Sequence, residues 1–189
     1  MSDDLIVKGV AGTCITFSFI LAGKERRRLQ LRLKLTMLGN AVTQSWMTVP
    51  ALLVNFPPPS SPEHKERARL LGRQWPLCWT VGNQFFRPIS TLGFLGYAYA
   101  GYATYKQGVL ARNDWKLFAV AAVMHLTTII HSAKNMQPLN DKLEALAGRA
   151  SDTELKEAES IAKRWASWNR LRLVTPVIAG SLALYQLLA

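Results

Sequence analysis

The 189-residue sequence contains few of the side chains that bind metals or form disulfides. Its two cysteines, Cys14 and Cys78, lie in apolar surroundings, are too few for a disulfide framework and form no CxxC pair. Its three histidines form no HxxxH pair and no group of two histidines with a carboxylate inside an apolar segment. Ligands for haem, non-haem iron or copper are therefore missing. We predict no metal site, and only packing roles for the cysteines.

A glycine-rich phosphate loop is also missing, because no GxGxxG pattern follows a predicted strand. The sequence consequently has no loop of this kind to bind the phosphates of a nucleotide cofactor. Together with the shortage of metal ligands, this predicts a protein that works without cofactors. A redox enzyme built on this sequence would need a substrate that reacts with its oxidant unaided.

Acidic residues are scarce: 12 Asp and Glu stand against 23 Lys and Arg, which gives a formal net charge of +11. Nucleic-acid binding would call for a basic arm with interleaved aromatic residues on a soluble domain. Here the basic residues lie between apolar segments, which is typical of loops that contact anionic lipid headgroups. We therefore expect membrane lipid, and no nucleic acid, among the partners.

Long apolar runs, by contrast, are frequent. The strongest, residues 115–133, carries one charge near its start and is long enough to cross a hydrocarbon core about 30 Å thick. Residues 88–105 carry no charge, and Gly93, Gly96 and Gly101 within them would let neighbouring helices approach closely. The predicted membrane spans are 5–22, 35–56, 88–105, 115–133 and 173–189, with a position on the membrane surface as the alternative for 5–22.

These spans predict an all-α fold: an integral membrane four-helix bundle in residues 35–189, preceded by an additional apolar helix and basic linker in residues 1–34. We expect a multi-pass protein of an endomembrane, compatible with an oligomer. Alternation of the spans places the long connections 57–87 and 134–172 on one face of the membrane. The six basic residues of 23–34 favour the cytosol for the other face.

The connection 134–172 contains a helix signal. Ser151 is followed three positions later by Glu154, a capping box that predicts a helix start. Further along, Trp165, Asn169 and Arg172 have the spacing i, i+4, i+7 that places them on one face of a helix. Amides, an indole and a guanidinium group are thus predicted to lie together near the membrane surface.

Two other groups of polar and aromatic side chains are predicted at the same surface. His131 and Asn135 are four residues apart at the end of the span 115–133, with Asn140 shortly after. The segment "QWPLCWTVGNQFFRP" adds the side chains at the start of the span 88–105, namely Trp75, Asn83, Phe86 and Arg87. These groups could surround a flat polar ligand above apolar helix walls.

Each of these side chains also has a purely structural interpretation. The tryptophans could belong to the aromatic belt of the membrane interface, and the two arginines could contact lipid phosphate. The asparagines could cap helix ends, and His125 and His131 could simply pack between helices. His64, in a charged segment, is predicted to be solvated.

The motifs resemble those of a known family. "NMQPLNDKLEAL" followed by "RWASWNRLR" is similar to the N-x-P-L-N and W-x-x-x-N-x-x-R signatures of the anthrone-oxygenase-like family of small membrane proteins. "SWMTVPALL" and "QWPLCWTVGNQFFRP" look like further motifs of that family, so the resemblance covers about residues 36–189. The first signature departs from the commonest form by one additional residue before the proline.

This resemblance implies four helices and the oxidation of a polyketide anthrone to an anthraquinone by O₂ without metal or flavin. We assign His131 as general base, Arg172 and Asn169 as oxyanion donors supported by Asn135 and Asn140, and Trp165 and Trp75 as walls that stack on the rings. Asn83, Phe86 and Arg87 would complete the binding site. One alternative is a non-catalytic membrane scaffold or assembly partner. Another is a transporter, but a transporter needs polar residues along a path at mid-membrane depth, and the spans 88–105 and 173–189 contain few.

Overall fold

The computed structural model of the chain describes residues 10, 11, 13, 40–108 and 114–188. The predicted span 5–22 and the basic linker 23–34 lie almost entirely outside the described residues, as does the first part of the predicted span 35–56. The additional N-terminal helix and the boundary between residues 34 and 35 therefore stay predictions.

Within 40–108 and 114–188 the chain is helical and contains no strand, so the all-α prediction is confirmed there. The first long rod is α5 (His64–Gln107), which includes the predicted span 88–105 and continues through Pro76 and Pro88. The second rod is an unbroken succession of α6 (Trp115–His131), η3 (Ser132–Met136) and α7 (Gln137–Ala145). Asp114 caps the start of α6 by accepting a hydrogen bond from the backbone amide of Lys116 at 2.9 Å.

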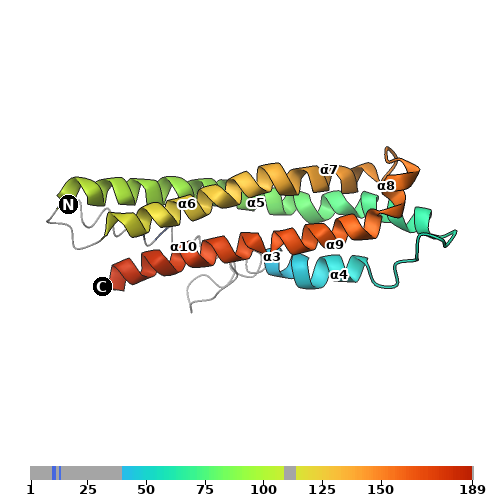
Figure 1. Cartoon of the computed structure of the whole chain (residues 1–189), viewed down its shortest axis with the longest axis horizontal. Coiled ribbons are helices and arrows are strands. Elements are labelled where there is room, and N and C mark those ends of the chain that lie inside the picture. Colours follow the sequence, from blue (N-terminus) through green and yellow to red (C-terminus); the bar gives the residue numbers. More distant parts are fainter. Residues whose placement is uncertain (1–9, 12, 14–39, 109–113, 189) are drawn as a thin grey trace.

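The third rod contains the predicted capping box. It consists of α8 (Asp152–Lys156), α9 (Ala158–Asn169) and α10 (Leu171–Leu188), and Ser151 and Glu154 cap α8 reciprocally as predicted. A short fourth rod, made of α3 (Asn40–Thr43), η1 (Gln44–Thr48) and α4 (Val49–Leu52), packs against α9 (Figure 1). The three long rods lie side by side along the length of the molecule (Figure 1).

The segments predicted as long connections are mostly helical. The physical reason is an apolar stripe among their charges: Ala68, Leu71 and Trp75 are buried at helical spacing on α5. They pack in one cluster with Leu139 and Leu143 of α7. His64, predicted to be solvated, is buried at the start of α5, and its ring nitrogens lie 2.6 Å and 2.9 Å from the carbonyl oxygens of Pro57 and Leu155.

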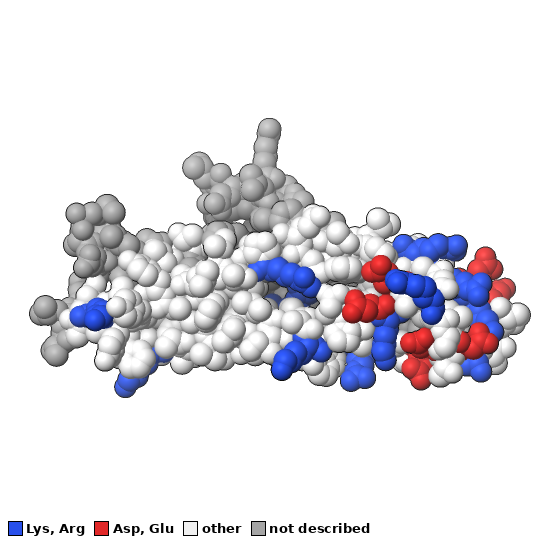
Figure 2. All heavy atoms as spheres, turned by 90° about the horizontal axis from the view of Figure 1, so that it is seen from above, with Lys and Arg blue, Asp and Glu red and all other residues white. Residues whose placement is uncertain are grey.

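The molecule has two halves with different surfaces. One half has a hydrophobic core formed by residues of α4, α5, η3, α7, α8 and α9. On the face shown in Figure 2, the acidic and basic residues gather at this end, while the other end is nearly free of charge. In that apolar half many large hydrophobic side chains are exposed: Leu92, Leu95, Tyr99, Tyr102, Val120, Val123, Ile130, Val174, Ile178 and Tyr185.

Such an exposed apolar surface is typical of a region that contacts lipid or a partner protein. Among the described residues, one continuous helix, Trp115–Ala145, is long and apolar enough to cross a membrane. The predicted span 115–133 forms its first part. The multi-pass arrangement and the endomembrane location stay predictions.

The predicted close approach of helices is found at Gly93, since a Cβ atom there would lie 2.5 Å from the ring of His125 on α6. An even closer approach occurs at Gly72 in the charged half. There a Cβ atom would lie 2.3 Å from the backbone nitrogen of Ala147 and 2.7 Å from the carbonyl carbon of Leu146. Backbone atoms cannot move aside as a flexible side chain would, so the packing of α5 against the end of α7 depends on this glycine.

We expect Gly72→Ala to destabilise the protein by about 1–3 kcal/mol, the usual effect of overpacking a close contact. Thermal unfolding of the purified variant in a neutral detergent measures the effect. Gly148→Ala is the matched control, because a Cβ atom at Gly148 would meet nothing within 4 Å. Equal melting temperatures for the two variants would contradict the packing described for α5 and α7.

Candidate functional site

Two π-helical turns position polar side chains in the middle of the molecule. η3 interrupts the second rod directly after His131, and η1 interrupts the short rod. In a π turn each backbone hydrogen bond joins residues five apart, whereas in an α-helix it joins residues four apart. The turn therefore changes which side chains face the neighbouring rods, and such turns are often found at functional sites. Asn135 is on η3 and Ser45 is on η1, and each contacts a predicted site residue.

His131 is buried, and both of its ring nitrogens have a partner. Nδ1 lies 3.0 Å from the amide nitrogen of Asn135, and Nε2 lies 3.1 Å from the backbone oxygen of Trp168. Its ring also stacks on the indole of Trp168, with centroids 5.3 Å apart and planes within 4°. If the Asn135 amide donates to Nδ1, the imidazole is neutral with its proton on Nε2. For His131 to accept a proton at Nδ1, the Asn135 side chain would have to turn its oxygen towards the ring.

A buried chain of hydrogen bonds holds Arg172. Its Nη1 donates to Oδ1 of Asn169 at 3.2 Å, and Nδ2 of Asn169 donates to Oγ of Ser45 at 3.0 Å. Asn169 is fully buried, and Arg172 is 7% exposed. The i, i+3 relation of Asn169 and Arg172 was expected from their spacing. Ser45, which orients the amide, was not.

Arg172 and Arg87 line the same cavity, which we call the arginine cavity. It has a volume of about 250 Å³ and lies between α5, the junction of α6 with η3, and α10; its lining residues are Arg87, Ser90, Thr91, Ile129, Ser132, Ala133 and Arg172. A buried arginine, Arg172, and an exposed one, Arg87, thus line a small space whose other lining residues carry hydroxyl or aliphatic side chains. Among the residues that the structure describes, no carboxylate lines this cavity. The arrangement suits a ligand that carries or develops negative charge.

Arg87 is oriented from the second rod. Its Nη2 donates to Oε1 of Gln137 at 2.6 Å, and Nε2 of Gln137 donates to Oδ1 of Asp141 at 2.7 Å. Gln137 follows directly after η3 and precedes Pro138, so it is one of the two residues that separate Asn135 from Pro138 where the commonest form of the motif has one. The sequence offered this departure from the motif as a signal, but it gave no indication of the partner.

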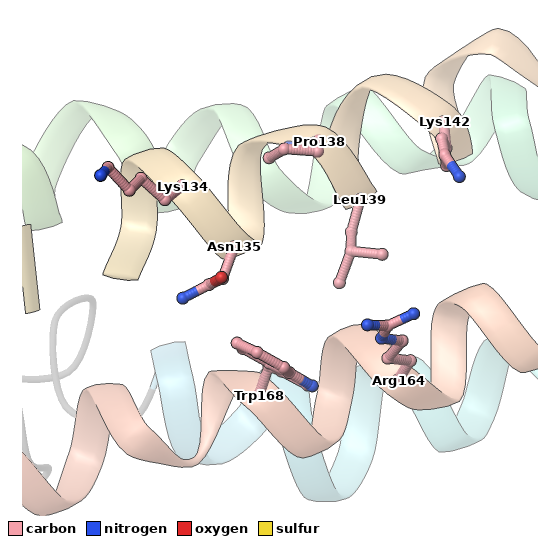
Figure 3. Close-up of a pocket in the computed structure, with 7 residues that line it drawn as sticks. All are labelled: Lys134, Asn135, Pro138, Leu139, Lys142, Arg164 and Trp168. Carbon is pink, nitrogen blue, oxygen red and sulfur yellow. The ribbon is translucent and has the colours of Figure 1, made fainter. Parts of the chain in front are cut away.

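A second cavity, which we call the lysine cavity, lies between η3 and α7 on one side and α9 on the other. It has a volume of about 230 Å³ and is lined by Lys134, Asn135, Pro138, Leu139, Lys142, Arg164 and Trp168 (Figure 3). Asn135 and Trp168 of this cavity both contact His131. His131 itself lines neither cavity but lies next to residues of both.

Three further predicted site residues meet in the core of the charged half. The indole nitrogens of Trp75 and Trp165 both donate to Oδ1 of Asn140, at 3.2 Å and 2.7 Å, and the two indole rings lie edge to face at 5.1 Å. All three side chains are buried, and none lines either cavity. Their arrangement suits a link between α5, α7 and α9, and their predicted contact with a substrate stays a prediction.

The remaining predicted residues are on α5. The side-chain nitrogen of Asn83 is buried and has no hydrogen-bond partner among the described residues, while the side chain of Phe86 is not described. No cluster of three or more metal-binding side chains occurs in the described part of the chain. Of the predicted site residues, the structure brings together His131 with Asn135, and Arg172 with Asn169 and Arg87. Their common position at a membrane surface stays a prediction.

Comparison with known proteins agrees with the motifs. Residues 75–182, more than half of the chain, match the anthrone oxygenase family. The chain is also 26% identical over 153 residues to a protein described as monooxygenase hypC from Dothistroma septosporum (strain NZE10 / CBS 128990). The matched residues cover 79% of this chain and 76% of that protein. No solved structure matches. The resemblance predicted from the motifs is thus confirmed, and the chain belongs to the anthrone oxygenase family.

Proposed function

We propose that this protein is a cofactor-independent oxygenase that oxidises an anthrone-like aromatic polyketide to a quinone with O₂, and that the arginine cavity binds the substrate. The family and the monooxygenase relative support a monooxygenase-type enzyme. The observation that carries the proposal is the meeting of a buried arginine, Arg172, and a second arginine, Arg87, at one small and otherwise uncharged cavity.

An anthrone can react with O₂ without a cofactor because its CH₂ group is acidic. Loss of one proton gives an aromatic, phenolate-type anion, which can pass an electron to O₂. Combination of the resulting radical with superoxide forms a carbon–oxygen bond, and loss of water from the peroxide gives the new carbonyl. One oxygen atom of O₂ enters the quinone and the other leaves as water, so the reaction balances without any other reductant. The protein has to remove the proton and stabilise the anion.

The arginine cavity supplies stabilisation of the anion. Arg172 is held by Asn169 and Arg87 by Gln137, so both guanidinium groups are oriented before the charge develops. In a site with little water, such fixed charges interact more strongly with an oxyanion than they would in solution. His131, which is adjacent to Ser132 and Ala133 of the cavity, is the candidate base and depends on the orientation of Asn135.

We further propose that the apolar half is embedded in a membrane and that the cavity lies at the membrane surface. The exposed hydrophobic side chains of α5, α6 and α10 and the apolar helix Trp115–Ala145 support this placement. The boundary between the halves is also where Arg87, His131 and Arg172 are found. A flat hydrophobic substrate and O₂, which is more soluble in apolar media than in water, could both reach the cavity from the bilayer.

The test is to incubate the purified protein with an anthrone under air and under nitrogen and to follow quinone absorbance and O₂ consumption. We expect quinone formation that exceeds the buffer rate, needs O₂ and consumes one O₂ per quinone. The same rate with protein as with buffer, across anthrones of different ring substitution, would contradict the proposal and favour the non-catalytic scaffold.

Gln137 is expected to act as a positioning residue for Arg87. Gln137→Leu removes the acceptor of the Arg87 hydrogen bond, so we expect KM for the anthrone to rise by about two- to tenfold, the equivalent of one hydrogen bond, with a smaller change in kcat. Gln107→Leu, at the far end of α5, is the matched control. A KM that stays at the wild-type value in Gln137→Leu would show that Arg87 does not depend on this contact.

A further inference from the structure

We infer that the lysine cavity binds the phosphate of an anionic phospholipid, with the acyl chains lying on the apolar half of the molecule. This inference rests on the membrane placement proposed above. It concerns a site that lies on another face of the second rod from the arginine cavity and shares none of its lining residues.

The charge of the lysine cavity is unbalanced. Lys134, Lys142 and Arg164 line it, and no acidic side chain does. In the part of the chain that the structure describes, none of these three cations has a carboxylate within ion-pair distance, whereas Lys65 and Lys163 do. Three positive charges around a space of about 230 Å³ would repel one another, so a bound anion would stabilise them.

Two acidic groups close to Lys142, Glu154 and Asp141, already have other partners. Glu154 is close enough for the charge of Lys142 to contribute to lowering its pKa, but hydrogen bonds from the backbone and hydroxyl of Ser151 contribute more and hold its carboxylate at the start of α8. Asp141 accepts a hydrogen bond from Gln137. Lys142 therefore remains available to an anion from outside the protein.

The cavity is also partly apolar. In Figure 3, Asn135 and Leu139 project from the second rod towards Trp168 and Arg164 on α9, while Lys134 and Lys142 lie at the two ends of the space. The guanidinium group of Arg164 lies 5.8 Å from the centre of the Trp168 ring. Cations around an indole and aliphatic groups match a ligand with an anionic head and an apolar body, which favours a phospholipid over free phosphate.

The position of the cavity favours the same ligand. Lys134 follows the apolar helix α6, and Trp168 precedes α10, so the cavity opens where the charged half begins. Within about one turn on the apolar side, Ile130 and Leu171 are exposed. A phosphate in the cavity would therefore lie at the level of the headgroups, with an apolar surface beside it for the acyl chains.

Native mass spectrometry of the purified full chain in a neutral detergent tests this inference. The probes are phosphatidylglycerol, phosphatidylcholine with the same acyl chains, and inorganic phosphate. The cavity variant carries Lys134→Gln, Lys142→Gln and Arg164→Gln. The control variant loses the same charge at exposed positions outside both cavities, with Arg69→Gln, Arg73→Gln and Lys156→Gln.

We expect phosphatidylglycerol to bind the wild type and the control variant at least about tenfold more tightly than the cavity variant, because each basic residue near a membrane surface contributes severalfold to affinity. Equal affinity of the two variants, or equal binding of phosphatidylglycerol and phosphatidylcholine, would overturn the inference. Inorganic phosphate that binds as tightly as phosphatidylglycerol would overturn the lipid assignment. The single variant Lys142→Gln, expected to show an intermediate affinity, covers the case in which the triple variant does not fold.

The binding measurement requires no turnover. A failure here would remove the lipid site and leave the oxygenase proposal intact. Absence of oxygenase activity, in turn, would leave the comparison of the two variants unchanged.

Discussion

Arg172→Ala is expected to slow oxygen-dependent quinone formation by about 100-fold or more, the effect of removing one donor from an oxyanion site. Arg172 is the most buried cationic side chain at the arginine cavity and is fixed by Asn169. Its loss would remove the charge that favours the substrate anion over the neutral anthrone. Because the effect concerns a charge that develops during the reaction, we expect it mainly in kcat.

Two further variants separate charge from packing. Arg172→Met keeps most of the side-chain volume and should be as slow as Arg172→Ala. Arg170→Ala removes an exposed arginine two residues away, whose guanidinium group lies 5.6 Å from the centre of the Trp46 ring and does not line the cavity, and it should keep the wild-type rate. Steady-state rates on variants with wild-type melting temperatures give the comparison. A rate for Arg172→Met within threefold of that for Arg170→Ala would remove Arg172 from the site.

Asn140→Ala is expected to have the largest effect on stability. It removes the shared acceptor of Trp75 and Trp165 and leaves two indole N–H groups buried without a partner. Each such group costs about 1–3 kcal/mol, so we expect a loss of about 2–6 kcal/mol in the free energy of unfolding. Chemical denaturation in a neutral detergent measures this loss.

The control for Asn140→Ala is Asn135→Ala. Asn135 is an amide on the same rod, but it is only half-buried, and within the described part of the chain its side chain makes one hydrogen bond, to His131. Its replacement should change the free energy of unfolding by about 0.5–1.5 kcal/mol. If Asn140→Ala were no less stable than Asn135→Ala, the link through Asn140 would not hold α5, α7 and α9 together.

The charge and hydropathy pattern of the sequence was enough to predict the helical segments 88–105, 115–133 and 173–188 and one helix start. Residues 115–133 and 151–154 are examples, because a long apolar run and a capping box are local signals. The first part of α5, up to residue 87, and all of α7 were instead predicted to be long connections. Their apolar stripes, such as Ala68, Leu71 and Trp75, are interrupted by charges and become clear only when a second stripe packs against them.

The candidate site could be predicted as a set of residues but not as a geometry. Spacing alone places Asn169 and Arg172 on one helix face, and alternation of spans predicts that His131 and Arg87 lie at the same level. The π turns η1 and η3 have no recognisable signal in the sequence, and they determine the contacts of Ser45 and Asn135. Trp75, Trp165 and Asn140 lie together away from the arginine cavity because of the way the rods pack, which no local pattern in the sequence shows.

The central claim is that the arginine cavity stabilises the anion that its bound substrate forms on losing a proton. The most direct test is the absorption spectrum of an anthrone bound to the purified protein under nitrogen, where oxidation cannot follow. We predict that the bound anthrone shows the spectrum of its anion at a pH well below that at which the free anthrone ionises, and that this spectrum is lost in Arg172→Met. A bound anthrone that keeps the spectrum of its neutral form, or one whose ionisation is the same in Arg172→Met as in the wild type, would contradict the account.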